Sequence, residues 1–143
     1  MPEYKKFGIH LKVKNFYKSL NFYLKLGFKP AFAYGDKDYL EKFAKGVPSA
    51  PEKYHGMTFD IGGSLFEIAD GHVAVKVEVF KQDITSSKIS AMIDVDSLEK
   101  IMQICNENEF KIVKNPVKYP WGTVELVVRD PDGFILVFRE FIK

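Results

Sequence analysis

The sequence predicts an α+β fold in which one unit, a strand followed by a helix and three strands, occurs twice. Two observations support this prediction. The same succession of alternating and helical apolar periods is found in both halves of the 143-residue chain. The spacing is repeated as well, because the segments 13–28 and 95–110 have the same length and both run from a valine to a phenylalanine. We therefore expect two βαβββ modules in one chain.

The first module begins with a strand and a helix. Residues 7–15 alternate apolar and polar side chains, which predicts a strand with one buried face. Asn15 is a suitable N-cap residue, and the helical spacing of apolar residues after it ends at Gly27. Residues 27–34 predict a second strand, which Pro30 places at a sheet edge.

The middle of the chain is less regular. Residues 35–56 hold several glycines, prolines and charges, which predicts a surface loop with a short helix around 39–45. Residues 56–71 predict a hairpin that turns at Gly62–Gly63. Residues 72–80 carry a valine at alternate positions, which predicts a further strand whose place in a sheet stays open.

The second module repeats this order. Ser97 is a possible N-cap between a strand and an amphipathic helix, and Cys105 lies on the apolar stripe of that helix, so we expect it in the core. Asp130–Gly133 has the composition of a tight turn, in which Pro131 fixes φ and Gly133 accepts a positive φ. The expected strands of this module are 88–96, 110–116, 122–130 and 134–141.

The elements predict the organisation of the chain. We expect a first module over residues 1–70, a linker over 71–87 and a second module over 88–143. The two modules together are expected to form one structural domain, because a chain of this length is typical of a single domain with a real core.

Composition excludes several classes of protein. The net charge is only +2 and there is no basic run, which argues against a nucleic-acid partner. No apolar stretch could cross a bilayer and the N-terminus lacks a signal-peptide pattern, so we expect no membrane partner. A single cysteine fits the reducing cytoplasm. The 15% of aromatic residues predict a phenylalanine-rich core, with a few aromatics in a ligand pocket.

Two segments resemble a known superfamily. Residues 14–28, KNFYKSLNFYLKLGF, are similar to the first helix of the vicinal oxygen chelate superfamily, and residues 119–138, YPWGTVELVVRDPDGFILVF, resemble its C-terminal signature. This superfamily includes glyoxalase I, bleomycin-resistance proteins and extradiol dioxygenases. The resemblance implies paired βαβββ modules whose curled sheets enclose a cleft. It also implies that four inward side chains bind a divalent metal in the metal-dependent members.

The four positions that the resemblance implies for the metal are poorly equipped here. They carry Gly8 and Glu67 in the first module, and Ser90 and Val137 in the second. Only Glu67 has a side chain that binds divalent metals well. We therefore expect no metal and no cofactor of the usual family kind.

Strand alternation predicts which side chains face the expected cleft. One face of the first module carries Gly8, His10, Lys12, Leu65, Glu67 and Ala69, and one face of the second carries Ser90, Met92, Asp94, Ile135, Val137 and Arg139. From these faces and Trp121 we predict a ligand-binding set of His10, Lys12, Glu67, Ser90, Met92, Trp121, Val137 and Arg139.

Glu67 is the chemically most interesting of these residues. A buried carboxylate is costly unless it is paired, and Arg139 or His10 could be its partner. His10 could approach Glu67 if the strand register were shifted. Glu67 and His10 are then candidate catalytic residues, as acid and base, while the competing interpretations are a salt bridge that holds the modules together and a hydrogen-bonded polar histidine.

Trp121 and Glu140 are two further residues whose roles the sequence suggests. Trp121 either stacks on a flat ligand, as the resemblance to bleomycin-resistance proteins implies, or caps the core at the start of a strand. Glu140 lies an odd number of positions from Val137, so it faces the other side of its strand and is expected to be a solvated carboxylate.

The leading hypothesis is a cytoplasmic protein that binds a small, partly apolar molecule between its modules without the usual metal. The resemblance implies a homodimer. The alternatives are a lyase or isomerase that uses Glu67 and His10 as acid and base, a non-standard metal site, and a domain used only for protein contacts.

Overall fold

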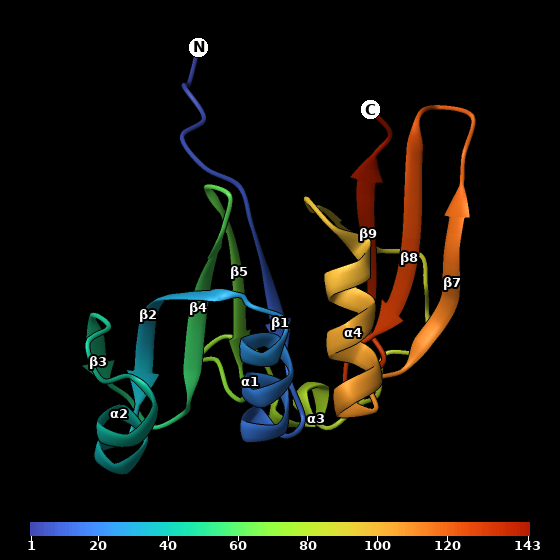
Figure 1. Ribbon diagram of the computed structural model, residues 1–143. Coiled ribbons are helices and arrows are strands. Elements are labelled where there is room, and N and C mark those ends of the chain that lie inside the picture. The colour runs from blue at the N-terminus through green and yellow to red at the C-terminus, as the bar shows by residue number, and fades with distance from the viewer. The chain divides into compact units, whose positions relative to one another are not determined.

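The computed structural model describes all residues from 1 to 143. The chain forms two compact units, residues 1–82 and 83–143, which are described separately below. Each unit has one mixed sheet and at least one helix packed on it, so the α+β prediction is confirmed (Figure 1). The predicted repeat of strand, helix and three strands is present in both units, and the first unit has three additional elements.

The first unit contains a five-stranded sheet and three helices. The strand order is β1-β5-β4-β2-β3, in which β1 is parallel to β5, β3 is parallel to β2, and the other neighbours are antiparallel. The elements are β1 (Gly8–Lys12), α1 (Phe16–Lys25), β2 (Lys29–Gly35), α2 (Lys37–Phe43), β3 (Ser49–Pro51), β4 (Gly56–Ile61), β5 (Ser64–Ala69) and α3 (Val77–Phe80).

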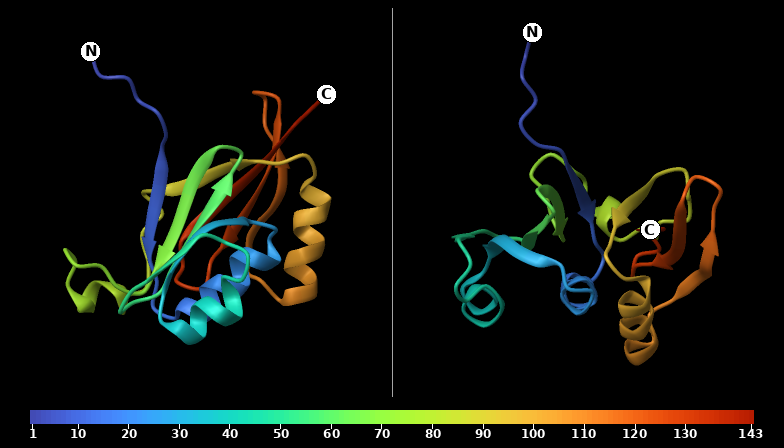
Figure 2. Two further views of the ribbon diagram at one scale, coloured as in Figure 1. Left: turned by 90° about the vertical axis from the view of Figure 1, so that its left-hand side faces the viewer. Right: turned by 45° about the horizontal axis from the view of Figure 1, so that its top comes forward.

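Aromatic side chains fill the space between α1 and the sheet. Tyr23 of α1 is fully buried, with its ring centroid 4.8 Å from that of Phe66 and 5.1 Å from that of Phe28. Phe59 of β4 is also fully buried and packs against Phe28. These residues confirm the predicted aromatic core. Helix α1 covers one face of the sheet, and the opposite face carries no helix (Figure 2).

The predicted strand at residues 72–80 is wrong. The segment forms turns and the short helix α3, and its backbone hydrogen bonds are local, as in Val75 N–H to the His72 carbonyl. Val73 is 88% exposed, so the alternation does not reflect a buried face. Alternation predicts a strand only where a neighbouring strand can accept its hydrogen bonds, and this segment has none.

The second unit contains a four-stranded sheet with the order β6-β9-β8-β7, in which β6 is parallel to β9. Helix α4 covers one face (Figures 1 and 2), and buried Cys105 lies in this core as predicted. The elements are β6 (Ser90–Asp94), α4 (Leu98–Asn108), β7 (Ile112–Lys118), β8 (Thr123–Arg129) and β9 (Ile135–Phe141).

The turn between β8 and β9 is confirmed in detail. The Asp130 carboxylate accepts the backbone N–H groups of Asp132 at 2.9 Å and Phe134 at 2.8 Å. Gly133 has φ +96°, which is the left-handed region that favours glycine. The Asp132 carbonyl also accepts the N–H of Ile84 at 2.7 Å, so the turn holds the start of this unit.

Glu140 faces α4, and the expectation of a solvated carboxylate is wrong. Its Oε2 accepts the N–H of Leu98 at 3.0 Å, which satisfies a free backbone donor in the first turn of the helix. We expect Glu140→Ala to lower the free energy of unfolding by about 1–2 kcal/mol. Urea unfolding measures this loss. Glu140→Gln is the matched control, and it should retain more than half of the stability because an amide oxygen still accepts.

Candidate functional site

The open face of the first sheet gathers three polar side chains around Glu67. The parallel register places His10 of β1 beside Glu67 of β5, and the antiparallel register places Glu67 beside Thr58 of β4. Thr58 Oγ1 donates to Glu67 Oε1 at 3.0 Å, and the Tyr34 hydroxyl on β2 is hydrogen-bonded to the same carboxylate. His10 Nδ1 lies 3.5 Å from Glu67 Oε2. We call His10, Tyr34, Thr58 and Glu67 the Glu67 cluster.

The register settles one expectation from the sequence. His10 needs no shift to reach Glu67, because the two residues are direct partners while Gly8 lies opposite Leu65. His10 is thus a partner of Glu67 as proposed from the sequence. The other proposed partner, Arg139, binds a carboxylate of its own unit. Its Nε donates to Asp94 Oδ1 at 2.7 Å.

Burial shapes the chemistry of the cluster. Burial lowers the pKa of His10, although the nearby Glu67 carboxylate acts in the opposite direction. Because a carboxylate only accepts, we assign the ring proton of neutral His10 to Nδ1, which faces Glu67, and the lone pair to Nε2. Nε2 is buried and has no hydrogen-bond partner. Burial also raises the pKa of Tyr34, so its hydroxyl keeps the proton that it donates to Glu67.

Sequence reasoning missed Tyr34 and Thr58. Both lie on the open face, but strand alternation assigns them to that face only once the strand order β5-β4-β2 is known. The predicted residue Lys12 lies on the same face, opposite Ala69.

The side chains of the first unit do not fit the metal site that the resemblance implies. A Cβ atom at Gly8 would lie 2.9 Å from the Leu65 Cβ, so the structure leaves no room there for a ligating side chain. In neither unit do three or more His, Cys, Asp or Glu side chains form a group that could hold a metal ion. The Glu67 oxygens face the hydroxyls of Thr58 and Tyr34, which donate hydrogen bonds to a carboxylate and do not replace a second metal-binding side chain.

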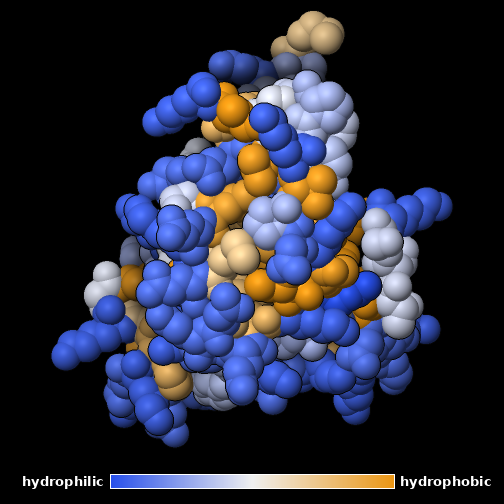
Figure 3. Space-filling model, turned by 45° about the vertical axis from the view of Figure 1, so that its right-hand side comes forward, coloured by the Kyte–Doolittle hydropathy of each residue, from blue (hydrophilic) through white to orange (hydrophobic).

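The second unit also has an open face, on the side of its sheet away from α4. Met92 of β6 is 64% exposed beside the partly exposed Val137 of β9, and Asp94 and Arg139 form the ion pair described above. Hydrophobic residues reach the protein surface in patches between hydrophilic ones (Figure 3). Of the residues predicted for this face, Ser90 is exposed, whereas Ile135 is buried.

Trp121 does not cap the core. Its side chain is 63% exposed and stacks on Tyr119 with ring centroids 4.6 Å apart and planes 8° apart. The indole N–H donates to Glu125 Oε2 at 2.9 Å, which fixes the orientation of the ring. The interpretation of Trp121 as a core residue is wrong, and a stacking role toward a ligand stays a prediction.

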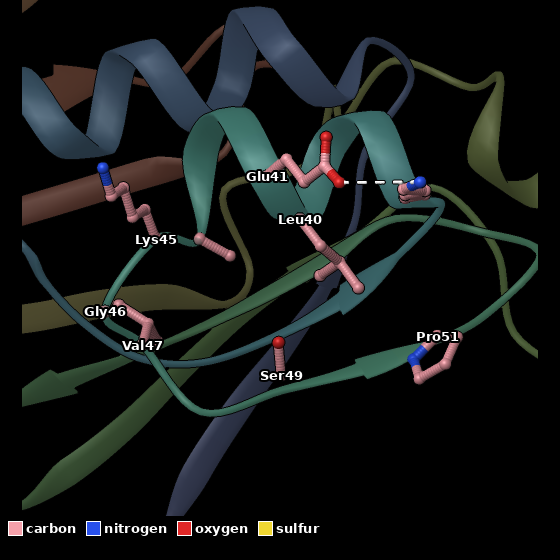
Figure 4. A pocket seen from close by; sticks show the side chains of 9 residues that line it. Leu40, Glu41, Lys45, Gly46, Val47, Ser49 and Pro51 are labelled. Atoms are coloured by element: carbon pink, nitrogen blue, oxygen red, sulfur yellow. Dashed lines mark ion pairs between the residues drawn. The ribbon is translucent and has the colours of Figure 1, made fainter.

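A separate hollow of about 440 Å³ lies between α2 and β3 (Figure 4). Leu40 points from α2 toward the strand that carries Ser49 and Pro51, and Lys37 forms an ion pair with Glu41 at 3.8 Å. An exposed ion pair of this kind contributes little to the stability of the fold. This exposed pair does not hold an acid or a base in a fixed position, so we place the candidate site at the Glu67 cluster.

His55 connects two carboxylates at the end of the same unit. Its Nδ1 lies 2.8 Å from Asp70 Oδ2 and its Nε2 lies 2.7 Å from Asp36 Oδ2, while Phe16 stacks on the ring. Burial alone lowers the pKa of His55, but the hydrogen bonds to Asp70 and Asp36 outweigh it and raise the pKa above 6.5. Since Asp36 caps α2, the imidazolium joins that helix to the end of β5.

This arrangement predicts a pH dependence of stability. A histidine whose pKa is raised on folding stabilises fully below its unfolded pKa of about 6.5, and that contribution is lost as the pH rises through the folded pKa. We expect the free energy of unfolding to fall over this window in urea titrations. The variant His55→Gln should remove this fall. The control variant His72→Gln should keep the fall in stability, because His72 Nδ1 is bonded to the Ala74 N–H and not to a carboxylate.

The sequence matches the family model of the Glyoxalase/Bleomycin resistance protein/Dioxygenase superfamily over residues 9–138. The chain belongs to this superfamily. The match contains both segments on which the resemblance was based, 14–28 and 119–138, and it confirms that resemblance. A comparison with curated proteins gives no match.

Several solved structures share the fold of this chain. A glyoxalase/bleomycin resistance protein/dioxygenase from Nocardioides is 13% identical, covering 100% of this chain and 87% of that one, with a TM-score of 0.65. A mutant glyoxalase I from Zea mays is 19% identical, covering 97% of this chain and 46% of that one, with a TM-score of 0.70. An integron cassette protein from V. cholerae is 19% identical, covering 98% and 97%, with a TM-score of 0.61. At these identities the likeness shows the fold alone.

None of the helices of this superfamily member has the length and apolar character that a membrane span requires.

Proposed function

We propose that this protein binds a small, partly apolar molecule at the Glu67 cluster without the divalent metal of the metal-dependent superfamily members. The observation that carries the proposal is the replacement of metal ligands by hydrogen-bonding groups. Of the implied ligand positions in the first unit only Glu67 has a suitable side chain, and its carboxylate is held by Thr58, Tyr34 and His10. Small-molecule sites use a few precisely placed polar groups to orient the ligand, and the Glu67 cluster supplies such groups.

Fragment screening by NMR tests this proposal. We expect small, partly apolar fragments to shift the amide signals of His10, Thr58 and Glu67, and we expect a chelator to leave these shifts unchanged. Fragments that bind only after a divalent metal has been added would contradict the proposal. A variant with Thr58→Val should weaken binding, whereas Lys37→Ala, in the hollow beside α2, should not.

The proposal includes two expectations that come from the resemblance. The predicted residues of the second unit, Ser90, Met92, Trp121, Val137 and Arg139, are proposed to contact a ligand, and Met92→Asp should then weaken ligand binding. The chain is also proposed to form a homodimer, and light scattering should give twice the mass of one chain.

A second candidate function is an isomerase or lyase that acts next to a carbonyl group. The observation that favours it is the buried, unpartnered Nε2 of His10, on a ring whose other nitrogen faces a carboxylate. A histidine held in this way is able to take a proton from a substrate at Nε2 while Glu67 stabilises the imidazolium.

Glu67→Gln separates the two candidate functions. If the protein is an enzyme, we expect this variant to lose turnover by a factor of about 100 or more, because proton transfer contributes that much. Ligand affinity should change less than about threefold, since the amide keeps a similar shape and still accepts from Thr58. Steady-state kinetics on 2-hydroxy-carbonyl compounds and glutathione adducts gives the first quantity, and calorimetric titration gives the second. An absence of turnover across both panels in the unmodified protein would contradict the enzyme candidate.

A further inference from the structure

Residues 71–80, which the sequence assigns to a linker and a strand, form the wall of an apolar hollow beside the Glu67 cluster. The hollow has a volume of about 380 Å³ and lies within the first unit. Its apolar lining includes Val73, Val75, Val77 and Phe80. We call this hollow the valine pocket. Val73 is 88% exposed and Val77 is 65% exposed, so a ligand in the pocket would remove apolar surface from water.

Two ring contacts join the lining of the valine pocket to the Glu67 cluster. Tyr54 lines the pocket, and its ring contacts Tyr34 edge-to-face with centroids 5.6 Å apart. His72 also lines the pocket, and its ring centroid is 5.6 Å from that of His10. Tyr34 and His10 are both partners of Glu67, so each connection leads directly to the carboxylate.

The two imidazoles offer opposite hydrogen-bonding groups. His72 Nδ1 accepts the backbone N–H of Ala74 at 3.0 Å, so the ring proton of His72 lies on Nε2, which is a donor. On His10 the proton lies on Nδ1, toward Glu67, and the buried Nε2 is an acceptor without a partner. The neighbouring rings thus present one donor and one acceptor.

We propose that the valine pocket and the Glu67 cluster together bind a neutral molecule with an apolar chain or ring next to a hydroxyl or a primary amide. Both head groups donate and accept, so each satisfies His10 Nε2 and His72 Nε2–H together. A carboxylate has no proton for His10 and approaches the Glu67 charge, and an ammonium group has no lone pair for His72. This inference rests on the proposed function and names the ligand class for the same site.

Four probes with the same six-carbon chain test the inference: hexan-1-ol, hexanamide, hexanoate and hexylammonium. Each is titrated into the full chain at neutral pH and followed by amide chemical shifts. We expect the alcohol and the amide to bind with a Kd of about 1 mM, as small ligands of this size allow. They should shift Val75 and Glu67 together and bind roughly tenfold more tightly than hexanoate and hexylammonium.

Variants show whether the head group meets His10. His10→Phe removes the acceptor and should erase the preference for the alcohol over hexanoate. His10→Gln keeps an acceptor and should restore part of it. Val75→Asp should weaken all four probes, and unchanged amide spectra away from the site would show that each variant is folded.

Several outcomes would overturn the inference. Equal or tighter binding of hexanoate, or a preference that survives in His10→Phe, would overturn the ligand class and leave the proposed function standing. The same holds if none of the four probes binds while other fragments shift the Glu67 cluster. If no fragment of any kind shifts the first unit, both the inference and the proposed function fail.

Discussion

Gly133→Ala is expected to lower the free energy of unfolding by about 3 kcal/mol. Gly133 has φ +96°, where a residue with a Cβ atom is strained by about 1–2 kcal/mol. The added Cβ would also collide with the Ile84 carbonyl oxygen, which is backbone and cannot move aside like a side chain. Such overpacking adds about 1–3 kcal/mol. Urea unfolding followed by circular dichroism measures the loss.

Gly122→Ala is the matched control, because it separates strain from collision. Gly122 lies in the same unit with φ +93°, and a Cβ atom there meets nothing within 4 Å. Its substitution should cost only the conformational part, about 1–2 kcal/mol. Equal losses in the two variants would show that the contact between the turn and Ile84 does not constrain the second unit.

Phe59→Ala is expected to lower the free energy of unfolding by about 4 kcal/mol, because Phe59 is fully buried against the aromatic core under α1. The same urea titration measures it. Phe32→Ala is the control on the neighbouring strand, since Phe32 lies opposite Thr58 on the open face and is 39% exposed. We expect it to cost about 1 kcal/mol or less. A larger loss at Phe32 than at Phe59 would contradict the assignment of the two faces.

The parts of the fold that depend on local signals were predictable from the sequence. The N-cap Asn15, whose Oδ1 accepts the Lys18 N–H at 3.1 Å, and the turn at Asp130–Gly133 each depend on residues only a few positions apart. The repeat of elements was also predictable, because equal spacing in the two halves needs no knowledge of long-range contacts.

The wrong predictions concern residues whose structure depends on a partner that is distant in the sequence. The valines of residues 72–80 alternate like a strand, but no neighbouring strand pairs with them, and the segment closes a pocket instead. Strand alternation correctly placed Glu140 and Val137 on opposite faces of their strand. The partner of Glu140, however, is the backbone of Leu98, 42 residues earlier. Periodicity predicts the face of a strand or helix on which a side chain lies, but it does not predict which residue that side chain contacts.

The candidate site shows the same division. Alternation placed His10 and Glu67 on one face, and the structure makes them neighbours. Tyr34 and Thr58 required the strand order and the register of β2, which shifts between Pro30 and Phe32. A single residue of slip would turn Tyr34 toward the core, so no pattern in the sequence alone could assign its hydroxyl to Glu67.

Titration of Zn²⁺, Ni²⁺, Mn²⁺ and Fe²⁺ into chelator-treated protein tests the central claim most directly. The claim is that Glu67 belongs to a hydrogen-bonded cluster and not to a metal site of the family kind. The account predicts weak binding of each metal by calorimetry, unaffected by Glu67→Gln, and ligand binding that needs no metal. Tight binding of one metal per chain that disappears in Glu67→Gln would contradict it.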